Sequence, residues 1–174
     1  TLFASDENNV VKPQMVDKYD VSADKLTWTF TLRDGLEWHD GKPVTAHDFV
    51  FAWRRTVDPA SASEYANIMN AIRNADEITA GKMPPESLGV QAEGDRILKV
   101  QFAKPVPYFD RLMTFNVFFP IREDFFKSTQ GRYASEADRL LYNGPFKMVR
   151  WVHGAHIRFE KNPAYWDKQR IAIN

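Results

Sequence analysis

Two pairs of residues in this sequence have side-chain types and spacing that could support chemistry. His153 and His156 form a His-x-x-His pair, which could bind a metal ion if both imidazoles faced one side and further ligands joined them. His39 and Asp40 are adjacent and could act as a base and its orienting carboxylate. A hydrolase would also need an activated nucleophile and an oxyanion hole.

The sequence offers neither pair the partners that it would need. The chain contains no cysteine, which excludes disulfides, thiolate metal ligands and cysteine nucleophiles. It has neither a Gly-x-Ser-x-Gly motif nor a glycine-rich phosphate loop. Asp40 and Gly41 have the pattern of a turn, and a hairpin turn at residues 153–155 would leave both flanking histidines in solvent. We therefore predict no metal, no cofactor and no enzymatic activity. The alternative, a hydrolase, predicts turnover that His39→Ala abolishes.

Aromatic residues make up 14% of the chain and could line a ligand cleft if they were exposed. Trp28, Phe30, Trp38 and Trp53 fall on periodic positions, so we expect them in the core. The apolar segment 115–121 is expected to be a buried strand or extended segment, which favours core positions for its phenylalanines as well.

Three residues are candidates for contacting a ligand: Tyr65, Phe115 and Asn116. Tyr65 follows a loop of small residues at the start of an expected helix, where a phenol can face outward. Asn116 lies where the chain enters the apolar segment 115–121, and Phe115 precedes it directly.

The elements that position these residues are organised around residues 25–53. Leu26, Trp28, Phe30 and Leu32 alternate with threonines, which predicts a strand with one buried face. The pattern resumes briefly at Leu36 and Trp38 after a turn. Thr45-Ala46-His47-Asp48 has the spacing of a capping box and predicts a helix that runs to Val57, where Asp58-Pro59 stops it.

The rest of the chain alternates between helices and hairpins. We expect a second helix over residues 64–80, a short helical turn over 15–19 and another helical turn over 122–127. Hairpins are predicted at residues 90–102 and 146–161. Pro13 argues for an edge strand or extended approach near the N-terminus. Ser135-Glu136-Ala137-Asp138 repeats the capping-box spacing.

The composition excludes several classes of protein. Lys and Arg together number 23, as do Asp and Glu, so there is no basic excess to recruit nucleic acid or an anionic membrane. No apolar run reaches the length needed to span a bilayer. At 174 residues with 44% hydrophobic residues, the chain is long enough to bury a sizeable core.

Both ends of the sequence suggest a piece of a longer protein. The chain begins at Thr1 without an initiator methionine or signal peptide. It ends in Ile171-Ala172-Ile173-Asn174, whose alternation is typical of the beginning of a strand.

Three motifs together resemble a known family. Residues 28–53 contain the pattern W-x-F-x-L-R-x-G-L-x-W-x-D-G-x-P-V-T-A-x-D-F-V-x-A-W, residues 143–148 read N-G-P-F-K-M, and residues 161–166 read K-N-P-A-Y-W. This combination resembles the family 5 extracellular solute-binding proteins, the receptors of bacterial ABC importers, and is most similar to their oligopeptide-binding branch. The likeness covers roughly residues 10 to 170.

The resemblance implies a fold and a site. The expected fold is α+β, an incomplete type II periplasmic-binding-protein-like fold with a mixed sheet and helices. Residues 1–121 would form most of the smaller N-terminal subdomain, and residues 122–174 the beginning of the main lobe. Residues 58–66 match the family pattern D-P-x-x-A-S-x-Y-A, in which the tyrosine looks toward the bound peptide. The resemblance therefore implies that Tyr65 contacts a peptide.

The resemblance also implies a function: the substrate-binding component of a peptide ABC transporter. Two lobes would close on an oligopeptide outside the inner membrane, and ABC permease subunits would read the closed form. We expect a monomer that is periplasmic, or lipid-anchored at the cell surface if the organism is Gram-positive. The family's contacts to the peptide N-terminus lie mainly in the C-terminal half, so we expect this chain alone to bind peptide weakly or not at all.

Two alternatives to an oligopeptide receptor stay open. The same fold could serve another cargo, namely a dipeptide, a murein peptide, a nickel chelate or haem. It could also be a sensor or interaction domain without a role in transport.

Overall fold

The computed structural model describes residues 1–173 and divides into two compact units. Unit 1 comprises residues 1–33 and 45–120. Unit 2 comprises residues 34–44 together with the chain from Ile121 onwards. Both units combine strands and helices, as the predicted α+β class requires. That unit 1 corresponds to a smaller subdomain and unit 2 to part of a main lobe stays a prediction.

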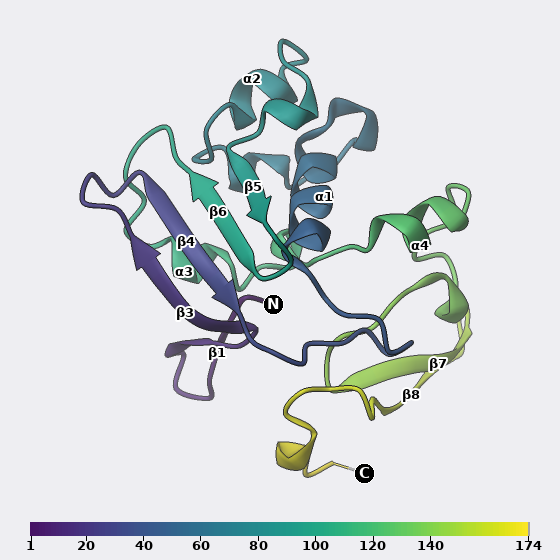
Figure 1. Ribbon diagram of the computed structural model, residues 1–174. Coiled ribbons are helices and arrows are strands. Elements are labelled where there is room, and N and C mark those ends of the chain that lie inside the picture. The colour runs from purple at the N-terminus through teal and green to yellow at the C-terminus, as the bar shows by residue number, and fades with distance from the viewer. Residues whose placement is uncertain (174) are drawn as a thin grey trace. The chain divides into compact units, whose positions relative to one another are not determined.

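Unit 1 is built on a four-stranded antiparallel sheet with strand order β3-β4-β6-β5 (Figure 1). The predicted alternation is confirmed in the second of these strands, where Trp28, Phe30 and Leu32 are buried and the threonines between them are half-buried. The predicted hairpin at residues 90–102 is also confirmed. The four strands are β3 (Val16–Val21), β4 (Thr27–Leu32), β5 (Val90–Glu93) and β6 (Ile97–Gln101).

Helix α1 (Ala46–Val57) begins and ends where the sequence predicts. The Asp48 carboxylate accepts a hydrogen bond from the Thr45 amide, with 3.0 Å between Oδ2 and N, and so satisfies one of the amides left free at the helix start. At the other end, Asp58 has extended backbone angles, as the following proline requires. The helix packs beside β5 and β6.

An aromatic cluster fills the core of unit 1. Phe109, from the short helix α3 (Phe109–Leu112), lies at its centre. Its ring centroid is 4.6 Å from that of Phe102, 5.6 Å from Phe118, 5.9 Å from Trp28 and 6.4 Å from Trp53. Most of these contacts are edge-to-face, the arrangement that aromatic quadrupoles favour. The expected core positions of Trp28, Phe30 and Trp53 are confirmed in unit 1.

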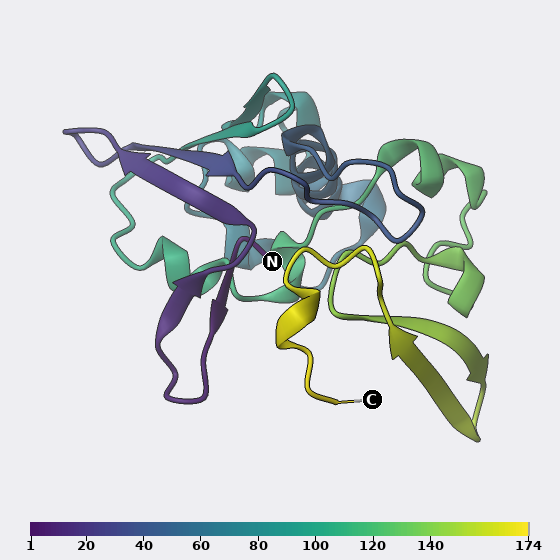
Figure 2. The ribbon, with the colours of Figure 1, turned by 60° about the horizontal axis from the view of Figure 1, so that its bottom comes forward.

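Smaller elements complete unit 1. The strands β1 (Phe3–Ser5) and β2 (Val11–Pro13) form a separate antiparallel hairpin (Figure 2), and Pro13 stands in a strand that pairs on one side only, as predicted. The short helices are η1 (Pro59–Ser61), η2 (Ala66–Met69), α2 (Ala75–Thr79), η3 (Pro85–Ser87) and η4 (Asn116–Phe118).

The prediction of one continuous helix over residues 64–80 was wrong. The segment forms η2 and α2, separated by turn residues, of which Ile72 and Arg73 pair with the end of β6 and the residue after it. Ile72 forms a bridge with Phe102, and the Arg73 amide donates to the Gln101 carbonyl at 2.8 Å. Asn74 follows with φ of 67°, which a continuing helix cannot include. Tertiary pairing therefore overrides the helical periodicity here.

Two further predictions for unit 1 need correction. Residues 15–19 do not form a helical turn, because β3 pairs with β4 and the Tyr19 ring stacks on Trp28 with 5.6 Å between centroids. Residues 115–121 are not a buried strand. The segment turns through η4, and only Phe118 of its three phenylalanines is buried.

Unit 2 contains the predicted hairpin at residues 146–161, formed by β7 (Phe146–Val152) and β8 (His156–Lys161). Asn162, which is buried, donates from Nδ2 to the Gly144 carbonyl at 2.9 Å and so ties the residues before β7 to those after β8. The helical turn expected over residues 122–127 is α4 (Glu123–Ser128). The remaining elements are η5 (Ala137–Arg139) and η6 (Lys168–Arg170).

Three smaller expectations in unit 2 had different outcomes. Trp38 is buried as expected, but its segment forms only an isolated bridge between Glu37 and Pro43 rather than a strand. Ser135 caps no helix, since the N-cap of η5 is Glu136 and it makes no capping hydrogen bond. Residues 171–173 form no strand, and the predicted strand start otherwise lies outside the described residues.

Candidate functional site

Tyr65 is held at the surface of unit 1 by its buried neighbours. It is the N-cap of η2, whose Ala66 and Met69 are buried and which contacts α1. At the start of the loop before it, the Asp58 carboxylate accepts a hydrogen bond from the Ala60 amide at 2.9 Å. The Tyr65 side chain is 58% exposed. The sequence prediction that this phenol faces outward is confirmed.

Phe115 and Asn116 are placed by η4, which also contacts α1. Phe118 anchors this turn, because its ring packs edge-to-face against Trp53 at 5.1 Å and its carbonyl accepts from Trp53 Nε1 at 3.1 Å. Phe115 precedes this anchor and is 52% exposed. Asn116 is exposed as well. The expectation that Phe115 and Phe119 are core residues was wrong, because both flank η4 with extended backbone angles and only Phe118, within the turn, docks against Trp53.

The structure attaches all three candidate residues to one helix, through η2 and η4. Within residues 1–173, neither the Tyr65 hydroxyl nor the Asn116 amide group makes a side-chain hydrogen bond. Their donors and acceptors are therefore open to a ligand or to water. No ring contact joins Tyr65 to Phe115 in the described part of the chain. Tyr65, Phe115 and Asn116 are thus an exposed set on unit 1.

The set has a chemical character suited to binding. A phenol and a carboxamide can donate to and accept from a peptide main chain, and a phenylalanine ring can pack against an apolar side chain. Sequence analysis missed that Phe119 and Tyr108 are also exposed aromatics on the same unit. The hydrophobic periodicity around these two residues does not indicate that they are exposed, because they lie in segments without regular secondary structure.

His39 and His153, which the sequence offers as candidates for chemistry, make contacts within unit 2. His39 Nδ1 accepts a hydrogen bond from the Tyr142 amide at 3.2 Å, and the His39 amide donates to the Tyr142 carbonyl at 2.8 Å. Burial lowers the pKa of His39 below its ordinary value, which favours the neutral ring that can accept this bond. His153 contacts Glu136 at 3.1 Å and stacks on Trp151. Among residues 1–173, no group of three or more His, Asp or Glu side chains could hold a metal ion.

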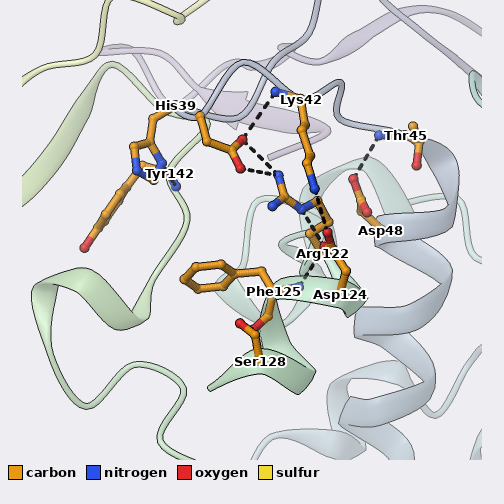
Figure 3. A network of polar contacts seen from close by, with 10 residues as sticks. His39, Lys42, Thr45, Asp48, Arg122, Asp124, Phe125, Ser128 and Tyr142 are labelled. Atoms are coloured by element: carbon orange, nitrogen blue, oxygen red, sulfur yellow. Dashed lines mark hydrogen bonds and ion pairs between the residues drawn. The ribbon is translucent and has the colours of Figure 1, made fainter. Parts of the chain in front are cut away.

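Asp40 is part of an ion-pair network, whose other members Lys42, Arg122 and Asp124 are labelled in Figure 3. This Arg122 network consists of Asp40, Lys42, Arg122 and Asp124. Arg122 Nη1 lies 2.8 Å from Asp40 Oδ2, and Arg122 Nε lies 2.6 Å from Asp124 Oδ1. Lys42 Nζ lies 2.9 Å from Asp124 Oδ2. The network ties residues 34–44 to the first residues after Ile121.

The network shifts the titration of both carboxyl groups. Hydrogen bonds from Lys42 and then Arg122 lower the pKa of Asp124 to about 2, although burial opposes them. Burial would raise the pKa of Asp40, but the hydrogen bonds from Arg122 and the Lys42 amide outweigh it and leave the pKa below its ordinary value. Only 12% of the Arg122 side chain is exposed. The network is therefore charged at neutral pH and has a structural role.

Comparison with known proteins identifies relatives over nearly the whole chain. The profile of the bacterial extracellular solute-binding proteins, family 5 Middle, matches residues 10–174. The oligopeptide-binding protein OppA of Bacillus subtilis (strain 168) is 39% identical over 159 residues, covering 91% of this chain and 29% of its own length. Other relatives are a dipeptide-binding protein of Lactococcus lactis and a murein peptide-binding protein of Escherichia coli.

Solved structures match the fold closely. The substrate-binding domain of an oligopeptide ABC transporter from Bacillus anthracis str. Ames superposes with a TM-score of 0.94 at 40% identity, over 97% of this chain and 32% of that one. Listeria monocytogenes OppA bound to peptide gives a TM-score of 0.92 at 38% identity, over 97% and 33%. The chain thus spans about a third of the length of the relatives that it matches.

Proposed function

Because this chain belongs to the family 5 bacterial extracellular solute-binding proteins, we propose that it is part of the substrate-binding component of a peptide ABC transporter. In this role it captures oligopeptides outside the inner membrane and delivers them to the permease subunits. The observation that carries the proposal is the exposed Tyr65 with its open hydroxyl, on the stretch of residues 58–66 that matches the oligopeptide-binding branch. Matches to OppA proteins, one of them with bound peptide, support the choice of cargo.

The exposed set suits recognition of an extended peptide without strong sequence preference. Tyr65 and Asn116 supply hydrogen-bonding groups for the peptide main chain, which is the same for every sequence. Phe115 supplies apolar area for a side chain, and water can fill the space that a smaller side chain leaves. Contacts to the peptide backbone would then supply the affinity, and the loosely filled space around the peptide side chains would allow many sequences to bind.

The proposed location follows from the same role. Relatives named periplasmic oligopeptide-binding proteins support a place outside the inner membrane, either in the periplasm or at the cell surface on a lipid anchor. In the part of the chain described by the structure, no helix has the length and apolar character to cross a membrane. We propose a monomeric receptor that acts by binding, without catalysis, since His39 and Asp40 are engaged with Tyr142 and Arg122.

Calorimetric titration with tri- to pentapeptides tests the role of Tyr65. In a protein that includes the remaining two-thirds of the family's length, Tyr65→Ala should weaken peptide binding by about tenfold, because it removes both ring and hydroxyl. Tyr65→Phe separates the two contributions. Tyr108→Ala is the matched control, since Tyr108 is 55% exposed on the same unit but is not in the exposed set.

Two results would contradict the proposal. Equal effects of Tyr65→Ala and Tyr108→Ala would remove Tyr65 from the ligand site. Micromolar or tighter binding by this chain alone would show that the site does not need the rest of the protein. We expect the chain alone to bind weakly or not at all.

A different cargo is the second candidate, because the relatives include dipeptide- and murein peptide-binding proteins. Mass spectrometry of ligands that co-purify with the protein distinguishes the two. A mixture of oligopeptides of several lengths and sequences supports the proposed function. A single murein peptide, or dipeptides only, would instead identify that cargo as the ligand.

A further inference from the structure

A polar cavity of about 450 Å³ lies within unit 1, away from the exposed set of Tyr65, Phe115 and Asn116. It is lined by side chains from α1, from the stretch that leads into α2, from η3 and from strands β4, β5 and β6. Helix α1 packs against η3, α2, β5 and β6, and the labelled elements lie side by side in Figure 1. The cavity is therefore a feature of one compact unit.

The wall of this cavity is fixed by close backbone pairing. The Arg73 amide donates to the Gln101 carbonyl at 2.8 Å, and the Gly89 amide donates to the Arg73 carbonyl at 2.9 Å. A Cβ atom at Gly89 would lie 2.7 Å from both the Arg73 Cβ and the Gln101 carbonyl oxygen, so only glycine permits this approach. Asn74 is held in the left-handed region while its Nδ2 donates to the Ser87 carbonyl at 2.7 Å. The backbone that carries Arg73 along this wall is thus fixed in place.

The charges around the cavity do not balance. Lys99 is paired with Glu93 at 2.6 Å, which leaves Arg54, Arg73 and Glu86 as the other charged residues of the lining. Within residues 1–173, neither guanidinium group is paired with a carboxylate. Two positive groups therefore face one negative group across a shared cavity.

The guanidinium groups also have unused donors. Arg54 donates from Nη2 to the Glu86 backbone carbonyl at 3.1 Å, but its Nε is buried and has no hydrogen-bond partner among residues 1–173. In the same described part of the chain, the Arg73 guanidinium makes a single long contact, 3.4 Å from Nη1 to Gln101 Oε1. A buried donor without a partner costs free energy that an acceptor can recover. Both arginines retain capacity for a ligand that brings oxygen atoms.

We propose that this cavity binds the oxyanion group of a small solute, a carboxylate or a phosphate, with Arg54 and Arg73 as its cationic ligands. Arginine matches both groups because its planar fork of N–H donors fits two oxygens of one anion. Asn74 and Gln101 supply further polar contacts at the wall. This second site lies apart from the exposed set, so its occupancy does not depend on the proposed function.

Titrations with inorganic phosphate and with succinate test the proposal and distinguish the two sources of oxyanion. Saturable binding of either probe is expected, with a shift in the ¹⁵N-detected signals of the Arg54 and Arg73 Nε–H groups. Arg73→Gln should weaken binding by about tenfold or more, and Arg73→Lys should restore part of it. Glu86→Gln should tighten binding by about two- to threefold, since it removes the opposing charge. A purely structural role for these residues predicts no such gain.

Arg111→Gln is the matched control. Arg111 is exposed on unit 1 and does not line the cavity, so its loss should leave anion affinity unchanged. Far-ultraviolet circular dichroism of each variant shows whether the fold is retained. The proposal is overturned if neither probe saturates on the order of 10 mM, if Arg111→Gln weakens binding as much as Arg73→Gln, or if Glu86→Gln fails to tighten it.

Discussion

The two units of this chain bury their side chains in different ways. Unit 1 has a continuous apolar core in which Phe109 contacts aromatic rings from β4, α1 and η4. In unit 2, only Thr129 and Asn162 are buried among residues 121–173, and the buried apolar residues Leu36, Trp38 and Val44 all belong to the segment 34–44. Unit 1 is held by packing, whereas unit 2 depends on one inserted segment and a polar network.

This difference predicts different responses to perturbation. Apolar burial is little affected by salt or by pH near neutrality, whereas exposed ion pairs are screened by salt and lost on protonation. Unit 2 also exposes Ile157 and Phe159 on β8, which shows that its hairpin contributes little buried area. Mutations that remove packing should therefore act on unit 1, and changes of charge should act on unit 2.

The largest effect is expected from Phe109→Ala. Removing the ring at the centre of the cluster leaves a cavity and should lower the free energy of unfolding of unit 1 by about 3–5 kcal/mol. Hydrogen exchange with mass spectrometry should show faster exchange in β4 and α1. Phe159→Ala is the control, because that ring is 54% exposed. If Phe109→Ala accelerated hydrogen exchange in β7 and β8 as much as in β4 and α1, the two units would unfold together, and the proposed difference between them would be wrong.

A smaller effect is expected from Arg122→Met, which keeps the apolar stem of the side chain and removes its charge. Asp40 and Asp124 would then lose their shared partner, and the free energy of unfolding of unit 2 should fall by about 1–2 kcal/mol, since both carboxylates remain partly solvated. Exchange should accelerate in residues 34–44 and in α4. Arg132→Met, an exposed change in the same unit, serves as the control. If the exchange rates in those segments did not change, the stability of unit 2 would have to come from the packing of Trp38 and its neighbours alone.

The smallest effect concerns acid. Asp124 has a pKa of about 2 in the folded protein against an ordinary value of 3.8, so between these values the unfolded state binds the extra proton. The stabilisation is present above about pH 4 and is lost as the pH falls through about 2. In Asp124→Asn, the loss of unfolding free energy that comes from protonating this carboxylate should disappear. The change should be only about a few tenths of a kcal/mol, because the Asp124 side chain is half exposed and its ion pairs are screened by solvent. Denaturant titrations between pH 2 and 5 measure it, and Asp138→Asn should keep the wild-type slope.

The sequence predicted those elements whose signals are local. The alternation of Trp28, Phe30 and Leu32, the capping spacing of Thr45 and Asp48, and the stop at Pro59 depend only on near neighbours, and each was confirmed. Both hairpins were predicted for the same reason, because a turn and two alternating runs suffice to define them.

The failures share a physical cause in long-range pairing. Residues 64–80 have apolar positions at helical spacing, yet Ile72 pairs with Phe102 and Arg73 with Gln101, partners that no local pattern reveals. Tyr19 lies in a strand, where its ring stacks on Trp28 of the neighbouring strand. In the candidate site, the exposure of Tyr65 could be predicted from its motif and loop. That of Phe115 could not, because it depends on Phe118 being the residue that docks against Trp53.

The division of residues 25–53 between two units has a consequence for biosynthesis. Leu36, Trp38 and Val44 leave the ribosome long before their companions in unit 2, since Lys42 and Asp124 are 82 positions apart. During synthesis the strand and the helix on either side of this segment can join unit 1, while its tryptophan has no finished surroundings. A nascent chain must keep this apolar loop from aggregating until the later residues emerge. Within the stretch that identifies the family most clearly, residues 34–44 thus complete their packing only after the later residues of unit 2 have emerged.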